Sequence, residues 1–286
     1  MSYRRPTVTP YTIMGVVNVT PDSFSDAGAF DDPAAAVAHG RRLVAEGAAI
    51  VDVGGESTRP GAAPVSAAEE LGRVLPVIEG LAGVEARISV DTMKLEVAAA
   101  ATEAGATYVN DVTAFRHDPG LADLVADRGL YCCLMHMRGE PRTMQENPRY
   151  DDVVDDVKAF LDERLHAATR AGIAEERIHL DPGIGFGKTL EHNFALLRRL
   201  GELTALGRPI VIGTSRKSFL GRVTGRDVTE RVPATVATTV LAFERGARVF
   251  RVHDVAATAD ALAVTTATLA AGWPGTQTRT LTTRTT

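Results

Sequence analysis

The stretch that begins at Asp181 combines residue types that could do chemistry. An apolar run ends in this carboxylate, and Pro182, three glycines and Lys188 follow within the next seven residues. Such a segment looks like a phosphate-binding loop, but Pro182 stands where that pattern requires its first glycine. The glycine spacing does not match the dinucleotide-binding pattern either. We therefore interpret Asp181 as a carboxylate at a strand end, above an open loop.

Polar residues stand at the ends of the other short apolar runs as well. They are Asn18, the loop from Glu56 to Arg59, Asp91, Asn110, His136, Asp181, Lys217 and His253. One such residue would be weak support, since strands often end in turn-forming Asp or Asn. Because the carboxyl ends of barrel strands share one rim, where the βα loops build active sites, the whole set predicts a common site.

The acceptors in this set favour a ligand that carries several N–H donors. Asp91, Asn110 and Asp181 together would suit the edge of a guanidine-like heterocycle. The same oxygens would also suit a divalent cation such as Mg²⁺. Zinc is not expected, because no His/Cys spacing matches its ligand patterns.

Cations mark the other half of the predicted site. Residues 215–218 read Ser-Arg-Lys-Ser after the seventh strand, where barrels often bind phosphate. Arg251 and His253 stand two apart, on one side of the last strand, and an inward Arg251 needs a partner, for which we expect an anionic ligand. No nucleophile elbow is present. The residues predict a phosphate-like anion beside a planar, N–H-rich ligand.

Short apolar strands that alternate with helices must position these residues. The predicted strands are 12–17, 49–53, 87–90, 106–109, 130–135, 178–180, 209–212 and 249–252. The predicted helices are 34–47, 66–80, 94–105, 118–128, 151–172, 190–200, 233–246 and 255–272. This alternation predicts an α/β fold, a (β/α)₈ TIM barrel, with a doubly wound open sheet as the rival. We expect a lead-in over 1–11, one domain over 12–274 and a disordered tail over 275–286.

Composition limits the classes of partner. The 286 residues carry a net charge of −5, and no run of Lys and Arg reaches five residues, so we expect neither nucleic-acid nor membrane binding. No apolar run reaches 18 residues and no signal pattern opens the chain, which favours a cytoplasmic protein. Cys132 and Cys133 would point to opposite faces of a strand, so we expect reduced packing residues.

Several motifs of the chain closely resemble the dihydropteroate synthase family. They are Met14–Asp26, Gly54–Gly61, Ser89–Thr92, Asn110–Val112, Met135–Met137, Asp181–Lys188, Thr214–Ser218 and Arg251–His253. The resemblance implies a barrel of the pterin-binding type. It also implies a transferase of folate biosynthesis that joins 6-hydroxymethyl-7,8-dihydropterin diphosphate to 4-aminobenzoate and releases diphosphate. One departure is Ala27, where the family usually has a glycine.

The resemblance assigns roles to named residues. Pterin binding falls on Asp91, Asn110, Val112, Met135, Asp181, Phe186 and Lys217. Diphosphate binding falls on Thr58, Arg59, Arg251 and His253, with Mg²⁺ held by Asn18. Aminobenzoate binding falls on Phe24, Pro60, Phe186, Lys217 and Ser218, and the catalytic roles on Asp26, Lys217 and Arg59.

Other features of the family follow as expectations. Sulfonamide inhibitors should bind, loops 18–30 and 54–65 should close over the site, and the predicted helices 233–246 and 255–272 are candidates for a homodimer face. Two alternatives remain open. One is a methyltetrahydrofolate-dependent methyltransferase domain, which should lack the anion-binding set at 215–218 and 251–253. The other is a non-catalytic pterin-binding paralogue.

Overall fold

The computed structural model describes residues 10–20, 32–59 and 61–270. The predictions for Phe24, Asp26, Ala27 and Pro60, and those for the terminal tail, lie outside these residues. So does most of the lead-in.

Eight parallel strands form the centre of the structure. They are β1 (Thr12–Asn18), β2 (Ile50–Gly54), β3 (Arg87–Asp91), β4 (Tyr108–Asp111), β5 (Tyr131–Met135), β6 (Ile178–Asp181), β7 (Val211–Ile212) and β8 (Val249–Val252). Their order in the sheet is β6-β5-β4-β3-β2-β1-β8-β7. An isolated parallel bridge between Leu180 and Ile210 joins the two edges, and the Leu180 amide donates to the Pro209 carbonyl at 3.0 Å. The predicted TIM barrel is confirmed, and the open sheet is excluded.

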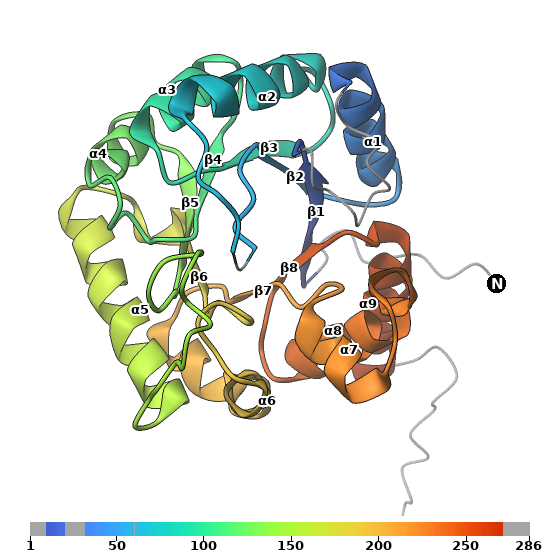
Figure 1. Ribbon diagram of the computed structural model, residues 1–286. Helices are drawn as coiled ribbons and strands as arrows, with labels where there is room; N and C mark the ends of the chain where they lie inside the picture. The colour runs from blue at the N-terminus through green and yellow to red at the C-terminus, as the bar shows by residue number, and fades with distance from the viewer. Residues whose placement is uncertain (1–9, 21–31, 60, 271–286) are drawn as a thin grey trace, which may run out of the picture.

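Helices surround the ring of strands, as Figure 1 shows. They are α1 (Pro33–Ala45), α2 (Ala67–Gly80), α3 (Leu95–Glu103), α4 (Gly120–Asp127), α5 (Val153–Arg170), α6 (Leu190–Arg198), α7 (Ser218–Thr224), α8 (Val232–Glu244) and α9 (Val255–Leu269). Side-chain caps explain several starts: Asp32 accepts from the Ala34 amide, and Ser66 accepts from the Glu69 amide. No helix was predicted over the short α7.

The strands are buried on both faces, as covered parallel strands must be. The face toward the helices carries most of the apolar core. The interior of the barrel is filled at one level by a smaller apolar group, namely Met14, Ile50, Tyr108, Cys133, Val211 and Val249. Cys132 belongs to the outer core and Cys133 to the inner group, and both are free and buried. Two residues further along β2, β4 and β8, the inward positions become polar, and these positions form the floor of the site.

The loop between β6 and α6 packs tightly against the loop that follows β5. Gly183 has a φ of +66°, and a Cβ there would lie 1.9 Å from the His136 carbonyl oxygen. Gly187 has a φ of +62°, and its Cβ would lie 2.6 Å from the Arg138 carbonyl oxygen. The glycines are therefore required by backbone contact, not by phosphate binding.

We expect Gly183→Ala to lower the free energy of unfolding by at least about 2 kcal/mol, since the Cβ adds a backbone clash to left-handed strain. Gly207→Ala is the matched control. Gly207 has a φ of +72°, and a Cβ at this position would meet no heavy atom within 4 Å. Gly207→Ala should lower the free energy of unfolding only by the cost of the left-handed conformation, about 1 kcal/mol. Urea denaturation measures both, and equal losses would show that the contact with His136 is unimportant.

Candidate active site

A hydrogen-bonded network centred on Asp52 forms the floor of the site. Asp52 lies in the middle of β2 and is 0% exposed. It accepts from Ser89 Oγ at 2.5 Å, from Asn110 Nδ2 at 3.1 Å and from Arg251 Nε at 2.7 Å. The same guanidinium donates through Nη2 to Asp91 Oδ2 at 2.7 Å. Four strands are thereby connected across the barrel interior. Asp52 was not among the sequence candidates, because it lies within an apolar strand and not at its end.

Arg251 has protein carboxylates as its partners. The sequence led us to expect an anionic ligand there, and the structure instead pairs the guanidinium with Asp52 and Asp91. Burial lowers the pKa of Arg251, but these two carboxylates outweigh burial and raise it. Burial raises the pKa of Asp91 to about 7, while Arg251 acts in the opposite direction. Arg251 thus favours the ionised form of Asp91, whereas burial favours its protonated form.

Asp181 and Lys217 face each other across the junction of β6 and β7. Asp181 is buried and accepts from the Gly183 amide at 2.6 Å. Burial raises its pKa, and the charge of Lys217 lowers it. The Lys217 ammonium donates to the Ile184 carbonyl and lies 4.6 Å from the centre of the Phe186 ring. Burial lowers the pKa of Lys217 to about 8. A proton donor and a carboxylate are therefore available beside an aromatic ring.

An apolar wall completes this side of the mouth. Its members are Val112, Met135, Met137, Met144 and the half-buried Phe186. Met135 pairs in register with Asp181, so the wall lies beside a buried carboxylate. Val112 follows Asn110 by two residues and comes from the same part of the chain. Acceptors beside an apolar wall fit a flat ligand with polar edges.

Positive charge gathers around His253. Burial and, to a smaller extent, the charges of Arg251, Arg216 and Arg59 lower the pKa of this imidazole to about 3. His253 Nδ1 lies 3.0 Å from Ser215 Oγ, which fixes the ring. Arg216 is itself held by Asp254, with Nε 2.9 Å from Oδ2. Arg251 and Arg216 are paired with carboxylates, so the cluster offers an anion guanidinium and imidazole N–H donors and not three uncompensated charges.

The remaining predicted residues lie around the mouth. Thr58 is half-buried and Arg59 is exposed in the loop after β2. Asn18 is half-buried at the end of β1, in register with Gly54. Ser218 is exposed at the first residue of α7. Phe24, Asp26 and Pro60 lie outside the described residues.

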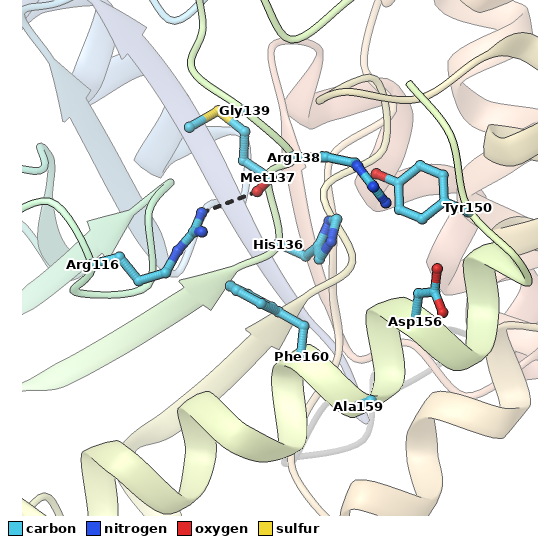
Figure 2. A pocket seen from close by; sticks show the side chains of 9 residues that line it. All are labelled: Arg116, His136, Met137, Arg138, Gly139, Tyr150, Asp156, Ala159 and Phe160. Atoms are coloured by element: carbon cyan, nitrogen blue, oxygen red, sulfur yellow. Dashed lines mark hydrogen bonds between the residues drawn. The ribbon is translucent and has the colours of Figure 1, made fainter. Parts of the chain in front are cut away.

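His136 differs from the other strand-end residues, because it points away from the barrel. It follows the inward Met135 and packs edge-on against Phe160 of α5, with ring centres 4.8 Å apart. Figure 2 shows it lining a cavity of about 380 Å³ beside α5. Its Nδ1 lies 2.9 Å from Lys188 Nζ, which also donates to the Phe186 carbonyl at 3.0 Å. His136 and Lys188 therefore support the glycine loop and take no direct part in the site.

Comparison with known proteins identifies the family. A family model described as pterin binding enzyme matches residues 14–253. A dihydropteroate synthase of Escherichia coli (strain K12) is 48% identical over 260 residues, which are 91% of this chain and 92% of that relative. The chain belongs to the dihydropteroate synthase family. This confirms the resemblance that the motifs indicated.

Solved structures of the dihydropteroate synthase family agree with this fold. The Yersinia pestis enzyme in a sulfonamide drug complex superposes with a TM-score of 0.88 at 43% identity, over 94% of this chain and 98% of that one. The Xanthomonas albilineans enzyme in complex with 7,8-dihydropteroate gives a TM-score of 0.83 at 49% identity, over 93% and 97%. In the described part of the chain, no helix has the length and apolar character needed to cross a membrane.

We expect Arg251→Met to raise the pKa of Asp91 above its present value of about 7, because the nearest opposing charge is removed. Carbon-detected NMR titration of the Asp91 carboxyl measures this value. The half-buried Arg245, which donates to the Leu241 carbonyl, provides the control Arg245→Met, which should leave the pKa of Asp91 unchanged. An unchanged pKa in Arg251→Met would show that the ion pair does not control this carboxylate.

The raised pKa of Asp91 in the folded protein makes its stability depend on pH. The ordinary pKa of 3.8 applies to Asp91 in the unfolded chain, and about 7 applies in the folded one. Between these values the native state holds a proton that the unfolded chain releases. The contribution of Asp91 to stability is therefore complete below pH 3.8 and is lost as the pH rises through about 7. In Arg251→Met this loss should extend to higher pH.

Proposed function

We propose that this chain is a dihydropteroate synthase. It would join 6-hydroxymethyl-7,8-dihydropterin diphosphate to 4-aminobenzoate, forming 7,8-dihydropteroate and diphosphate. The observation that carries the proposal is the arrangement of three acceptors, Asp91, Asn110 and Asp181, beside the apolar wall and the guanidinium groups around His253. The relatives from E. coli and X. albilineans support the same reaction.

The acceptors would hold the pterin by its N–H edge. Asp181 and Asp91 carry the anionic oxygens, and Asn110 is fixed by its bond to Asp52. Val112, Met135 and Phe186 would cover the faces of the ring system. Lys217 reaches this position as well, and its ammonium can donate to a ring acceptor.

The reaction needs charge stabilisation and no covalent nucleophile. The C–O bond to diphosphate breaks, negative charge grows on the leaving group, and Arg59, Arg251 and His253 would receive it together with Thr58. The remaining methylene is cationic, and we propose that Asp26, which lies outside the described residues, stabilises it. The amine of 4-aminobenzoate then forms the C–N bond and loses one proton. We place this substrate, and competing sulfonamides, near Phe24, Pro60, Phe186, Lys217 and Ser218.

Asn18 would hold a magnesium ion together with the diphosphate. Its amide oxygen lies at the barrel mouth and fits the oxygen ligands that Mg²⁺ prefers. Mg²⁺ usually keeps several waters and takes substrate phosphates as ligands, so one amide is a sufficient protein contribution. When bound, the ion would neutralise charge on the leaving diphosphate.

We further propose a cytoplasmic homodimer. Leu241 on α8 is 44% exposed and Val264 on α9 is 67% exposed, and both helices were candidates for a dimer face. The free cysteines agree with a reducing compartment.

The clustering of Ser215, Arg251 and His253 favours the synthase over a methyltetrahydrofolate-dependent methyltransferase domain.

Asp181→Asn should weaken pterin diphosphate binding about 10- to 150-fold, because a neutral amide replaces an anionic acceptor of N–H donors. Isothermal titration calorimetry measures the affinity. Asp156→Asn changes a carboxylate beside the outer cavity and should have no effect. Undiminished affinity in Asp181→Asn would remove Asp181 from the pterin site.

Turnover of both substrates by the wild type tests the function itself, and binding without turnover would indicate a non-catalytic paralogue.

Excess EDTA should abolish turnover, and added Mg²⁺ should restore it, because the leaving group needs a counter-ion. Asn18→Leu should raise the Mg²⁺ concentration required for half-maximal activity about tenfold, which corresponds to one lost ligand of about 1.4 kcal/mol. An Asn18→Leu enzyme with the wild-type Mg²⁺ requirement would exclude Asn18 as a ligand.

A further inference from the structure

The loop between β2 and α2 carries Thr58 and Arg59, and one carboxylate closes its base. Glu56 Oε2 accepts from Lys94 Nζ at 2.6 Å, and Glu56 Oε1 accepts from the Val65 amide at 3.3 Å. Figure 1 shows this loop extending from the rim toward the centre of the ring of strands. Glu56 thus joins the beginning of the loop to its end, and Lys94 holds Glu56.

Lys94 is the centre of a partly buried group of charges. It also pairs with Glu70 of α2, whose side chain is 0% exposed, while the side chains of Lys94 and Glu56 are 16% and 10% exposed. Burial lowers the pKa of Lys94, but the bonds to Glu56 and Glu70 outweigh burial and raise it. Because ion pairs of this burial are weakly screened, their geometry is better defined than that of surface pairs.

The backbone at the entry to the loop is fixed separately. A Cβ on Gly55 would lie 2.8 Å from Val74 Cγ1 of α2, so helix and loop are in close contact. Arg73 Nη1 donates to the Gly55 carbonyl at 2.7 Å. Within the loop, the Ala62 amide donates to the Arg59 carbonyl at 3.0 Å. The contacts at the base therefore fix where the segment that carries Thr58 and Arg59 begins and ends.

Lys94 connects this base to the floor of the site. It lies three residues after Asp91, and its amide donates to Thr92 Oγ1 at 3.2 Å. The Thr92 amide in turn donates to the Asn110 carbonyl at 3.1 Å. One short turn therefore presents Asp91 to the barrel and Lys94 to the loop.

We propose that Lys94 is a positioning residue, which acts through Glu56 to hold Thr58 and Arg59 over the anion-binding side of the mouth. The positive charge of Arg59 is already felt at His253, which agrees with this placement. The inference rests on the proposed function, in which these two residues receive the diphosphate. Lys94 itself would touch neither substrate.

Lys94→Met tests the proposal, with Lys94→Arg as the conservative variant. We expect Lys94→Met to increase amide hydrogen exchange of the Val65 N–H at least tenfold. The affinity for inorganic diphosphate and kcat/KM for pterin diphosphate should each fall about tenfold, whereas the affinity for 6-hydroxymethylpterin, which lacks the diphosphate, should be unchanged. Lys94→Arg should keep the Val65 exchange rate, the diphosphate affinity and kcat/KM within about twofold of the wild type, since the charge is retained.

Glu56→Gln separates positioning from folding. It leaves the Lys94–Glu70 pair intact, so it decides the question if Lys94→Met fails to fold. If Lys94 acts through Glu56, the variant that combines Lys94→Met with Glu56→Gln should lose no more than Lys94→Met alone. Glu103→Gln breaks the exposed pair with Arg128 at the end of α3 and should change nothing.

Two results would overturn the proposal. One is unchanged Val65 exchange in both Lys94→Met and Glu56→Gln. The other is an equal loss of affinity for 6-hydroxymethylpterin and inorganic diphosphate, which would indicate general damage. Absence of turnover in the wild type would contradict the proposed synthase but not the anchoring role, because exchange and diphosphate affinity are measured without turnover.

Discussion

The half-buried guanidinium of Arg251, paired with both Asp52 and Asp91, is the interaction on which the site depends. Two carboxylates this close inside a barrel would repel each other and take up protons, and one cation between them opposes this. The arrangement also orients Asn110 and Ser89 through Asp52. Breaking a buried pair of this kind on one side typically costs about 3–5 kcal/mol, because the other charge is left without compensation. The floor of the site is therefore also part of the stability of the barrel.

The alternation of side chains along the strands places this network where it can act. Ile50 fills the barrel interior and Asp52, two residues on, begins the polar level; Tyr108 and Asn110 follow the same rule. Apolar packing of the inner group lies directly below the network. A polar floor on an apolar base is a direct result of the strand period.

The sequence predicted the barrel and the strand-end residues well, because both depend on local patterns. Asp91, Asn110 and Asp181 lie at the ends of their strands, as expected. Asp52 is not part of the strand-end pattern, although a carboxylate inside an otherwise apolar strand needs a buried partner, as an inward arginine does. The partners of Arg251 also required knowledge of which strands lie opposite. His136 was misplaced because one residue along a strand reverses the side chain's direction.

The closure of the barrel has a consequence for ligand binding. β7 has only two residues, and a single bridge between Leu180 and Ile210 joins it to β6. Asp181 and Lys217 stand on the two sides of this joint. A ligand held by both residues spans the weakest connection of the ring, so it binds the closed barrel more strongly than an opened one. By mass action, filling the pocket suppresses local opening between β6 and β7, and any loosening there weakens the pocket by the same free energy.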